Sequence, residues 1–202
     1  VTSATRVSSP AVSMAFGTLM TIKKPKSHVF YLKEGCVATA LSWIFLSFFG
    51  ALPFWISGEI PSLIDALFET VSGFTTTGSS ILADVEALSH CALFWRSFTH
   101  WIGGMGVLVF MLALLPMAGP SSMHLMKAES PGPSVGKLVP KVRSTAKILY
   151  QIYFVLTVAM LACMILTGCP LFDSINLTFA TAGTGGFGVL DSSAAEYGAA
   201  TQ

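Results

Sequence analysis

The sequence contains few charged residues. Only 10% of its residues are Asp, Glu, Lys or Arg, whereas soluble domains contain about 25%. In their place, 53% of the residues are hydrophobic and the mean hydropathy is +0.71. This balance excludes an ordinary soluble domain and indicates a protein of the lipid bilayer. The net charge of +1 gives no support to a nucleic-acid partner, which would favour a strongly basic chain.

Cysteine pairs with metal-binding or redox spacing are also absent. The four cysteines are Cys36, Cys91, Cys163 and Cys169, and no two of them form a CxxC motif. A zinc site or a disulfide framework is therefore not indicated. We interpret the four as free thiols that pack as small hydrophobic side chains.

Three long apolar segments are predicted to cross the membrane as helices. They are Cys36–Ile56, Ala92–Pro116 and Lys147–Thr167, and each has the length of about 20 residues that a bilayer core requires. An earlier apolar run, Pro10–Ile22, is too short to span. It could be the apolar part of a signal peptide, but KKPK follows it in place of a cleavage site. We interpret residues 1–32 as the end of a preceding membrane segment with its cytoplasmic link.

Two shorter segments begin just after prolines. Residues 62–74 follow Pro61, and as a helix they would extend about 20 Å, which reaches only partway across a bilayer. Ser62 and Asp65 have the spacing of an N-terminal helix cap. The second segment, LFDSINLTFATAGTGGFG, begins after Pro170. Both are predicted to be re-entrant half-helices followed by loops.

The charges predict the orientation of the chain. Nine of the eleven basic residues precede the first span, lie between the second and third spans or begin the third: Lys23, Lys24, Lys26, Lys33, Lys127, Lys137, Lys141, Arg143 and Lys147. The positive-inside rule places these segments in the cytoplasm. Eight of the ten acidic residues fall in segments assigned to the other side: Glu59, Asp65, Glu69, Asp84, Glu86, Asp173, Asp191 and Glu196. Both half-helices are therefore expected to enter from the outside and return there.

An internal repeat appears when the sequence is aligned with itself so that Lys33 falls on Lys141. The same offset matches Leu63 with Leu171, Asp65 with Asp173, Thr70 with Thr178, Thr76 with Thr184, and Gly78 with Gly186. The order of span, Pro, half-helix and Thr/Gly loop repeats as well. We divide the chain into a first span, half-helix, span unit (33–116), a cytoplasmic loop (117–146) and the first part of a second unit (147–202).

The loops after the half-helices are predicted to form walls of an ion filter. A half-helix that enters from outside points its partly negative C-terminal end at the middle of the membrane, where a cation is favoured. Glycine allows unusual backbone dihedrals in the following loop, and threonine hydroxyls can brace it. Rows of carbonyl oxygens in such loops can replace the hydration shell of an ion. The two loops are Thr75–Gly78 and Gly183–Gly186.

Other small and polar residues in the spans have structural interpretations. Small residues in membrane helices allow close packing, and we interpret Gly103, Gly104 and Gly106 in this way. His100 could relay protons, but we favour a hydrogen-bonded packing histidine. Arg96 could pair with a carboxylate or with backbone carbonyls inside the bundle, or could reach the outer interface.

Three motifs resemble the Trk/Ktr/HKT superfamily of potassium transporters, and most closely its bacterial TrkH-type subunits. The motifs are ALFETVSGFTTTGSS, FWRSFTHWIGGMG and FATAGTGGFG, and the likeness runs from about Lys33 to the end of the chain. The resemblance implies an all-α, potassium-channel-like membrane protein with four units around one pore. The third and fourth units of that pattern, with the intramembrane gating loop of the third, are absent here. We therefore expect a fragment with about one and a half units that does not conduct alone.

The resemblance also implies a function, a site and partners. It implies potassium uptake across the inner membrane, with K+ as the transported ion and no organic cofactor or enzymatic activity in this chain. The expected filter residues are Thr75, Thr76, Thr77, Gly78, Gly183, Thr184, Gly185 and Gly186. The expected partners are a second copy in a homodimer, membrane lipid and a cytosolic, TrkA-like ring that binds nucleotides and gates the pore.

Two alternatives remain at this stage. Within transport, a sodium-dependent Ktr-like subunit is the main alternative. From a different class, a membrane-embedded hydrolase would use one of three serines as nucleophile and one of two histidines as base: Ser72, Ser79 or Ser80 with His90 or His100. Such an enzyme needs a base oriented by a third group, and no motif supplies one.

The predicted orientation can be tested by single-cysteine labelling of intact cells in a cysteine-free background. A thiol placed near Glu86 should react with an impermeant maleimide from outside. A thiol near Lys137 should react only after permeabilisation, because the basic segments are expected in the cytoplasm. The reverse pattern of labelling would contradict the orientation and the direction of both half-helices.

Overall fold

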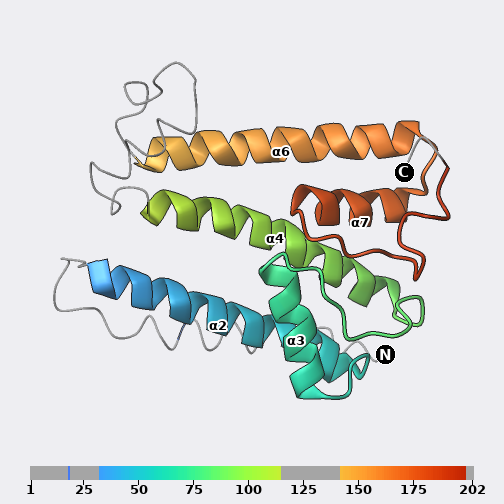
Figure 1. Cartoon of the computed structure of the whole chain (residues 1–202), viewed down its shortest axis with the longest axis horizontal. Helices are drawn as coiled ribbons and strands as arrows, with labels where there is room; N and C mark the ends of the chain where they lie inside the picture. The colour runs from blue at the N-terminus through green and yellow to red at the C-terminus, as the bar shows by residue number, and fades with distance from the viewer. Residues whose placement is uncertain (1–17, 19–31, 115–141, 199–202) are drawn as a thin grey trace.

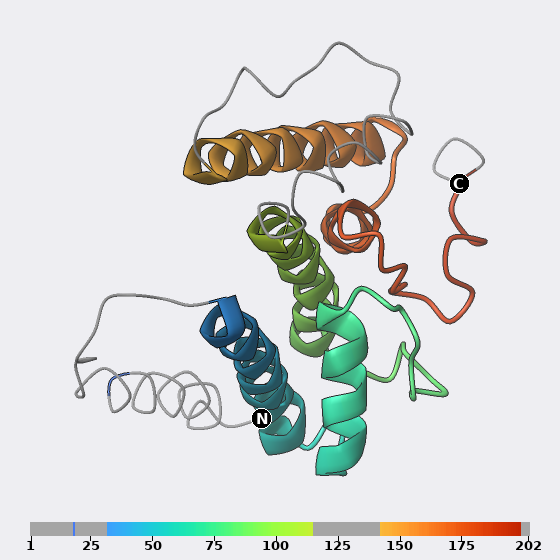
Figure 2. The same cartoon turned by 60° about the vertical axis from the view of Figure 1, so that its left-hand side comes forward.

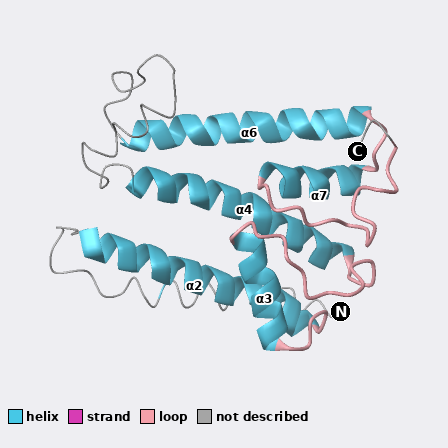
Figure 3. Ribbon diagram, viewed as in Figure 1, coloured by secondary structure: helices cyan, strands magenta, loops and turns pink. Residues whose placement is uncertain are grey.

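The computed structural model describes residue 18, residues 32–114 and residues 142–198. Its elements are α2 (Leu32–Ser57), α3 (Leu63–Phe74), α4 (His90–Leu114), α6 (Val142–Leu166) and α7 (Leu171–Ala182). Within these ranges the chain forms helices and loops and no strand (Figure 3). The prediction of an all-α fold is therefore confirmed for the described residues. The predicted segment Pro10–Ile22 lies outside them except for Thr18, as does most of the predicted loop 117–146.

The central element is α4. It packs against α2, α3, α6 and α7, whereas α3 otherwise packs on α2, and α7 otherwise packs on α6. Figures 1 and 2 show α4 between the two other long helices, with the short helices α3 and α7 on either side of its N-terminal half. Each half-helix therefore lies between α4 and the long helix that precedes it in sequence.

Two of the long helices have the composition of membrane spans. Within the described residues, Thr39–Ser57 of α2 and Ala146–Leu166 of α6 are long and apolar enough to cross a bilayer. The 25 residues of α4 extend about 38 Å at the usual rise per residue. Apolar side chains on α6, such as Val155 and Leu156, are 63% and 62% exposed, which suits contact with lipid. Helix α6 begins at Val142, ahead of the predicted start at Lys147, because the span continues as helix into its polar flank.

The half-helices confirm the repeat in detail. Both α3 and α7 contain 12 residues, and their first residues, Leu63 and Leu171, are a matched pair of the repeat. The Ser62 side chain accepts a hydrogen bond from the Asp65 amide, at 3.4 Å, so the predicted cap is present. Helix α7 instead begins after Pro170, without a side-chain cap. Proline suits this position because it lacks the amide hydrogen that a helix start leaves unpaired.

Glycines on α4 allow the other helices to approach closely. A Cβ atom on Gly103 would overlap the carbonyl oxygen of Phe74, at the end of α3. A Cβ on Gly104 would lie 2.8 Å from the Tyr153 hydroxyl of α6, and one on Gly106 would lie 3.1 Å from the Trp43 ring of α2. The prediction that these three glycines serve packing is confirmed.

Two groups of side chains hold the units together. A buried apolar cluster connects α2, α3, the start of α4 and the loops beside them: Ala51, Phe54, Ile60, Ala66, Val85, Leu88, Ala92, Leu93 and Val189. On the other side of α4, the rings of Phe98 and Trp101 pack against Phe179 of α7 at centroid distances of 5.6 and 5.5 Å. Trp101 also donates a hydrogen bond to Thr157 of α6, at 3.1 Å. Helix α4 therefore contributes to both units.

The three described cysteines are free thiols, as expected, but two of them, Cys91 and Cys163, are exposed and do not pack as buried side chains within the described residues. Cys91, Cys163 and Cys169 are free thiols, and Cys169 is buried at 8% exposure. The side chain of Cys36 lies outside the described residues.

We predict that Gly103→Ala destabilises the packing of α3 on α4. The added methyl group would occupy the position of the Phe74 carbonyl oxygen, and such overpacking typically costs about 1 to 3 kcal/mol. Thermal unfolding of the detergent-solubilised protein should show a lower midpoint. Gly198→Ala is the matched control, because a Cβ there would meet no atom within 4 Å. Equal midpoints for the two variants would contradict the packing role of Gly103.

Candidate functional site

Both half-helices end in the same backbone structure. After α3, Thr76 has a φ of 55° and Gly78 a φ of 76°; after α7, Thr184 has a φ of 60° and Gly186 a φ of 87°. The matched residues of the two loops therefore share the left-handed region. For a β-branched residue such as threonine this conformation is an outlier, and such strain concentrates at functional sites.

The left-handed threonines terminate the helices. The amide of Thr77 donates to the Ser72 carbonyl at 3.0 Å, and the amide of Gly185 donates to the Ala180 carbonyl at 2.9 Å. These are the bonds of a Schellman motif, whose left-handed position is usually glycine. Here Thr76 and Thr184 occupy that position. The pattern of threonine and glycine thus ends each helix abruptly and directs the chain into an extended loop.

The described residues supply no hydrogen bond to the carbonyl oxygens of the two loops. Among the described residues, no hydrogen bond ends on a carbonyl oxygen of Thr75–Gly78 or of Gly183–Gly186. Backbone carbonyls in a folded protein nearly always have partners, and hydrocarbon supplies none. Two rows of free oxygens at the ends of two half-helices are therefore suited to bind a cation.

Threonine hydroxyls brace the first loop, as expected. Thr75 donates from Oγ1 to the Val71 carbonyl at 2.7 Å, and its hydroxyl lies 2.8 Å from that of Thr77. These bonds tie the loop to the last turn of α3. They use hydroxyl groups and leave the loop carbonyls open.

The second loop rests on His100 of α4. A Cβ atom on Gly183 would overlap the His100 carbonyl, and one on Gly185 would overlap the imidazole ring. These two glycines are therefore required for close approach, whereas Gly78 and Gly186 have the positive φ. The loops also touch, because a Cβ on Gly78 would overlap the Gly185 carbonyl oxygen.

The prediction for His100 is half wrong. The side chain is fully buried and its ring stacks on Phe187 at a centroid distance of 4.0 Å, so it packs as expected. Neither ring nitrogen has a hydrogen-bond partner among the described residues, so the expected hydrogen bond is not found. The cause is the position of the ring, which lies against the glycine loop and an aromatic side chain.

A buried ion pair lies behind the loops. Arg96 Nε is 2.5 Å from a carboxylate oxygen of Glu69, and the two residues are 3% and 1% exposed. Of the alternatives for Arg96, pairing inside the bundle is therefore correct, and it involves both a carboxylate and the backbone carbonyl of Gly188. The charge pattern predicts Glu69 on the outer side and does not predict its burial. The local sequence around Glu69 gives no indication of a partner 27 positions along the chain.

Further out, the segments that follow the loops hold one another. The amide of Val85 donates to the Asp191 carboxylate at 2.7 Å, and the amide of Asp191 donates to the Glu86 carboxylate at 3.2 Å. This reciprocal pair joins the first unit to the second.

The hydrolase alternative finds no support in the described geometry. Ser72 is buried and its hydroxyl has no hydrogen-bond partner among the described residues. Ser80 donates to Glu69, and His90 packs on the Phe172 ring. The described residues contain no serine that is hydrogen-bonded to a histidine, which a Ser–His pair requires.

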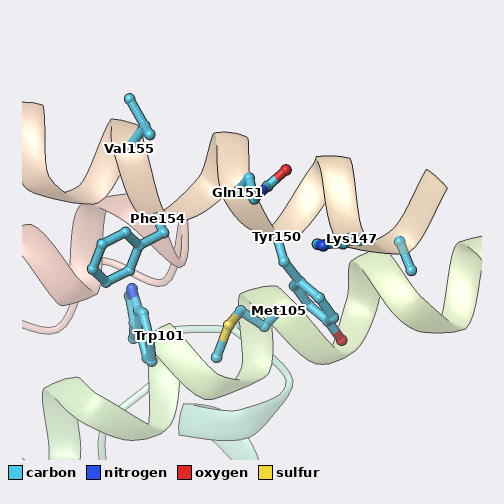
Figure 4. Close-up of a pocket in the computed structure, with 8 residues that line it drawn as sticks. Trp101, Met105, Lys147, Tyr150, Gln151, Phe154 and Val155 are labelled. Carbon is cyan, nitrogen blue, oxygen red and sulfur yellow. The ribbon is translucent and has the colours of Figure 1, made fainter. Parts of the chain in front are cut away.

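A groove between α4 and α6 is a separate feature. It has a volume of about 1100 Å³. It is lined by apolar and aromatic side chains with one lysine and one glutamine (Figure 4): Trp101, Met105, Ala146, Lys147, Tyr150, Gln151, Phe154 and Val155. No loop residue lines it. The candidate site is therefore the pair of loops, and the groove is not part of it.

The fold and the loops define a class of protein: a membrane protein of repeated helix, half-helix, helix units whose glycine loops meet beside a shared helix. The sequence profile of the TrkH family, described as "Cation transport protein", matches residues 4–201. The chain belongs to the TrkH family.

Similar proteins agree with this assignment. The chain is 41% identical over 187 residues to the Trk system potassium uptake protein TrkH of Escherichia coli K12, covering 90% of this chain and 38% of the relative. It is 43% identical over 164 residues to TrkH of Salmonella typhimurium, covering 80% and 34%. The crystal structure of the potassium transporter TrkH from Vibrio parahaemolyticus matches with a TM-score of 0.71 and 32% identity, covering 89% of this chain and 36% of that one. The chain thus spans little more than a third of the length of these relatives.

Proposed function

We propose that the chain forms part of a potassium uptake transporter of the inner membrane, in which its two glycine loops are two of four walls of the ion filter. The observation that carries this proposal is the pair of loops with matched backbone conformation and carbonyl oxygens free of hydrogen bonds. The proposed ion-binding residues are Thr75, Thr76, Thr77, Gly78, Gly183, Thr184, Gly185 and Gly186. K+ is the transported ion and is bound at these residues.

The chemistry of potassium suits such oxygens. A filter replaces the water around the ion with backbone carbonyl dipoles, and the C-terminal end of each half-helix adds a partial negative charge nearby. Two loops surround only part of an ion. A complete filter therefore needs further loops, which agrees with a chain that covers 38% of its Escherichia coli relative. The named relatives are themselves potassium uptake proteins, which supports K+ as the cargo.

The proposal extends to partners. The transporter would form a homodimer in the lipid bilayer and bind a cytosolic, TrkA-like ring that gates the pore with a nucleotide. The basic residues Lys137, Lys141 and Arg143 are suited to contact this ring, because the charge pattern of the sequence places them in the cytoplasm. Their side chains lie outside the described residues.

The contact with the ring is tested by replacing Lys137, Lys141 and Arg143 with Gln in a full-length transporter that carries this segment. We expect weaker co-purification of the ring with unchanged membrane insertion, because other cytoplasmic lysines remain. Replacing Lys23, Lys24 and Lys26 with Gln removes the same charge elsewhere and is the matched control. Unchanged affinity for the ring would assign the three residues to topology alone.

The filter itself is tested by Gly78→Ser and Gly186→Ser in the same full-length transporter. Each change places a side chain on a residue with a left-handed backbone conformation, at a cost of about 1 to 2 kcal/mol. It also displaces the carbonyl groups that are proposed to bind the ion. We expect lower discrimination between Rb+ and Na+ in uptake, with protein abundance in the membrane near that of the wild type.

The chain supplies matched controls for both changes. Gly58 has the same φ of 76° as Gly78, and Gly168 has a φ of 86° beside 87° for Gly186. Neither control glycine has an atom within 4 Å of an added Cβ, and both lie outside the loops. Gly58→Ser and Gly168→Ser therefore impose the same backbone strain. If all four variants keep the selectivity of the wild type, the loops are not the filter.

A further inference from the structure

The buried ion pair connects the segments that follow the two loops. In the first unit, the Glu69 carboxylate accepts hydrogen bonds from the Ser80 hydroxyl, at 3.0 and 3.1 Å, and from the Ile81 amide, at 3.0 Å. These two donors lie just after Gly78 in the chain. Glu69 therefore fixes the path by which the first loop leaves the site.

Arg96 carries the connection to the second unit. Its NH1 group donates to the Gly188 carbonyl at 3.0 Å, and its guanidinium carbon lies 3.7 Å from the centroid of the Phe187 ring. The contact continues toward the second loop, because Phe187 stacks on His100 and the His100 ring lies against Gly185. One arginine thus touches a residue that holds the first loop and two residues that continue the second.

The carboxylate of the pair is not repeated in the second unit. The alignment of the two units matches Glu69 with Leu177, although the matched Thr70 and Thr178 are both buried on their half-helices. If each half-helix needed this carboxylate in order to fold, both half-helices would contain one. Within the described residues, the pair instead lies where the two units meet.

The cost of burial argues against a role in stability alone. Buried ions lose their hydration, and replacing a buried pair with apolar side chains of similar volume is often neutral or stabilising. At the aligned position of the second unit, the half-helix carries the apolar and half-buried Leu177. The pair does supply what an apolar contact cannot, which is directed bonds to Ser80, Ile81 and Gly188 at once.

We propose that Glu69 and Arg96 are positioning residues of the filter, which fix the spacing of the two loops and thereby the selectivity between ions. The residues act through the backbone of the loops and do not touch the ion. This inference rests on the proposed function of the loops as an ion filter. It adds that the relative position of the two loops depends on one ion pair that contacts both units.

The main test is the double variant Glu69→Leu with Arg96→Met, made in a full-length transporter that carries this segment. Both buried charges disappear together, so neither remains unpaired, and leucine is the side chain that the second unit uses. We expect membrane abundance near that of the wild type and a ratio of Rb+ to Na+ uptake that falls by about fivefold or more. A wild-type ratio in this variant would overturn the proposal.

A second variant, Arg96→Lys, keeps the positive charge and removes the planar guanidinium group. A single ammonium group cannot reproduce the planar set of donors that contacts Glu69 and Gly188 together. The ratio of Rb+ to Na+ uptake should fall by about two- to threefold, with abundance unchanged. If neither variant reaches the membrane while the Gly58→Ser control does, the pair is a folding element and the proposal fails.

The Gly78→Ser variant separates this inference from the proposed function. If Gly78→Ser loses selectivity and both ion-pair variants keep it, the loops are the filter and the ion pair does not position them. If Gly78→Ser and Gly186→Ser also keep the selectivity of the wild type, the filter assignment itself has failed. Loss of selectivity in Gly78→Ser and in the double variant is the result that supports both.

Discussion

The structure depends on one constraint: backbone that leaves a helix within a membrane must find partners inside the protein, because hydrocarbon supplies none. Each half-helix ends in a Schellman cap, and the back of the second loop is covered by His100, which in turn stacks on Phe187. Glycines on α4 let the end of α3 and the second loop approach this helix closely. Among the described residues, the loop carbonyls are the part of this backbone that accepts no hydrogen bond.

Much of the fold can be predicted because its determinants are local. Apolar length predicts the spans, a proline and an S-x-x-D cap predict the start of α3, and the internal repeat predicts a second half-helix equivalent to the first, which the structure confirms with equal lengths. The Thr/Gly composition of the two loops and their place in the repeat single them out as a candidate site. These features need no knowledge of distant contacts.

The rest depends on contacts that no local pattern contains. Charge alone predicts Glu69 as an outer acid, since its partner Arg96 lies on another helix. Among the described residues, His100 has no hydrogen-bond partner and stacks on Phe187, which its neighbours in the sequence do not indicate. Sequence also does not separate the two uses of glycine. Gly186 provides a positive φ, whereas Gly185 provides room for an imidazole ring.

The difference between Glu69 and Leu177 has a consequence for how a membrane protein of repeated units can be built. In an assembly of identical subunits, every buried charge is present in each subunit. The free-energy cost of dehydrating that charge therefore occurs once per subunit. Units joined in one polypeptide can differ in sequence, so this requirement does not apply to them. One half-helix can contain a carboxylate that the matching half-helix lacks, so a buried ion pair can be placed at one junction between units, whereas strict symmetry would place it at every junction.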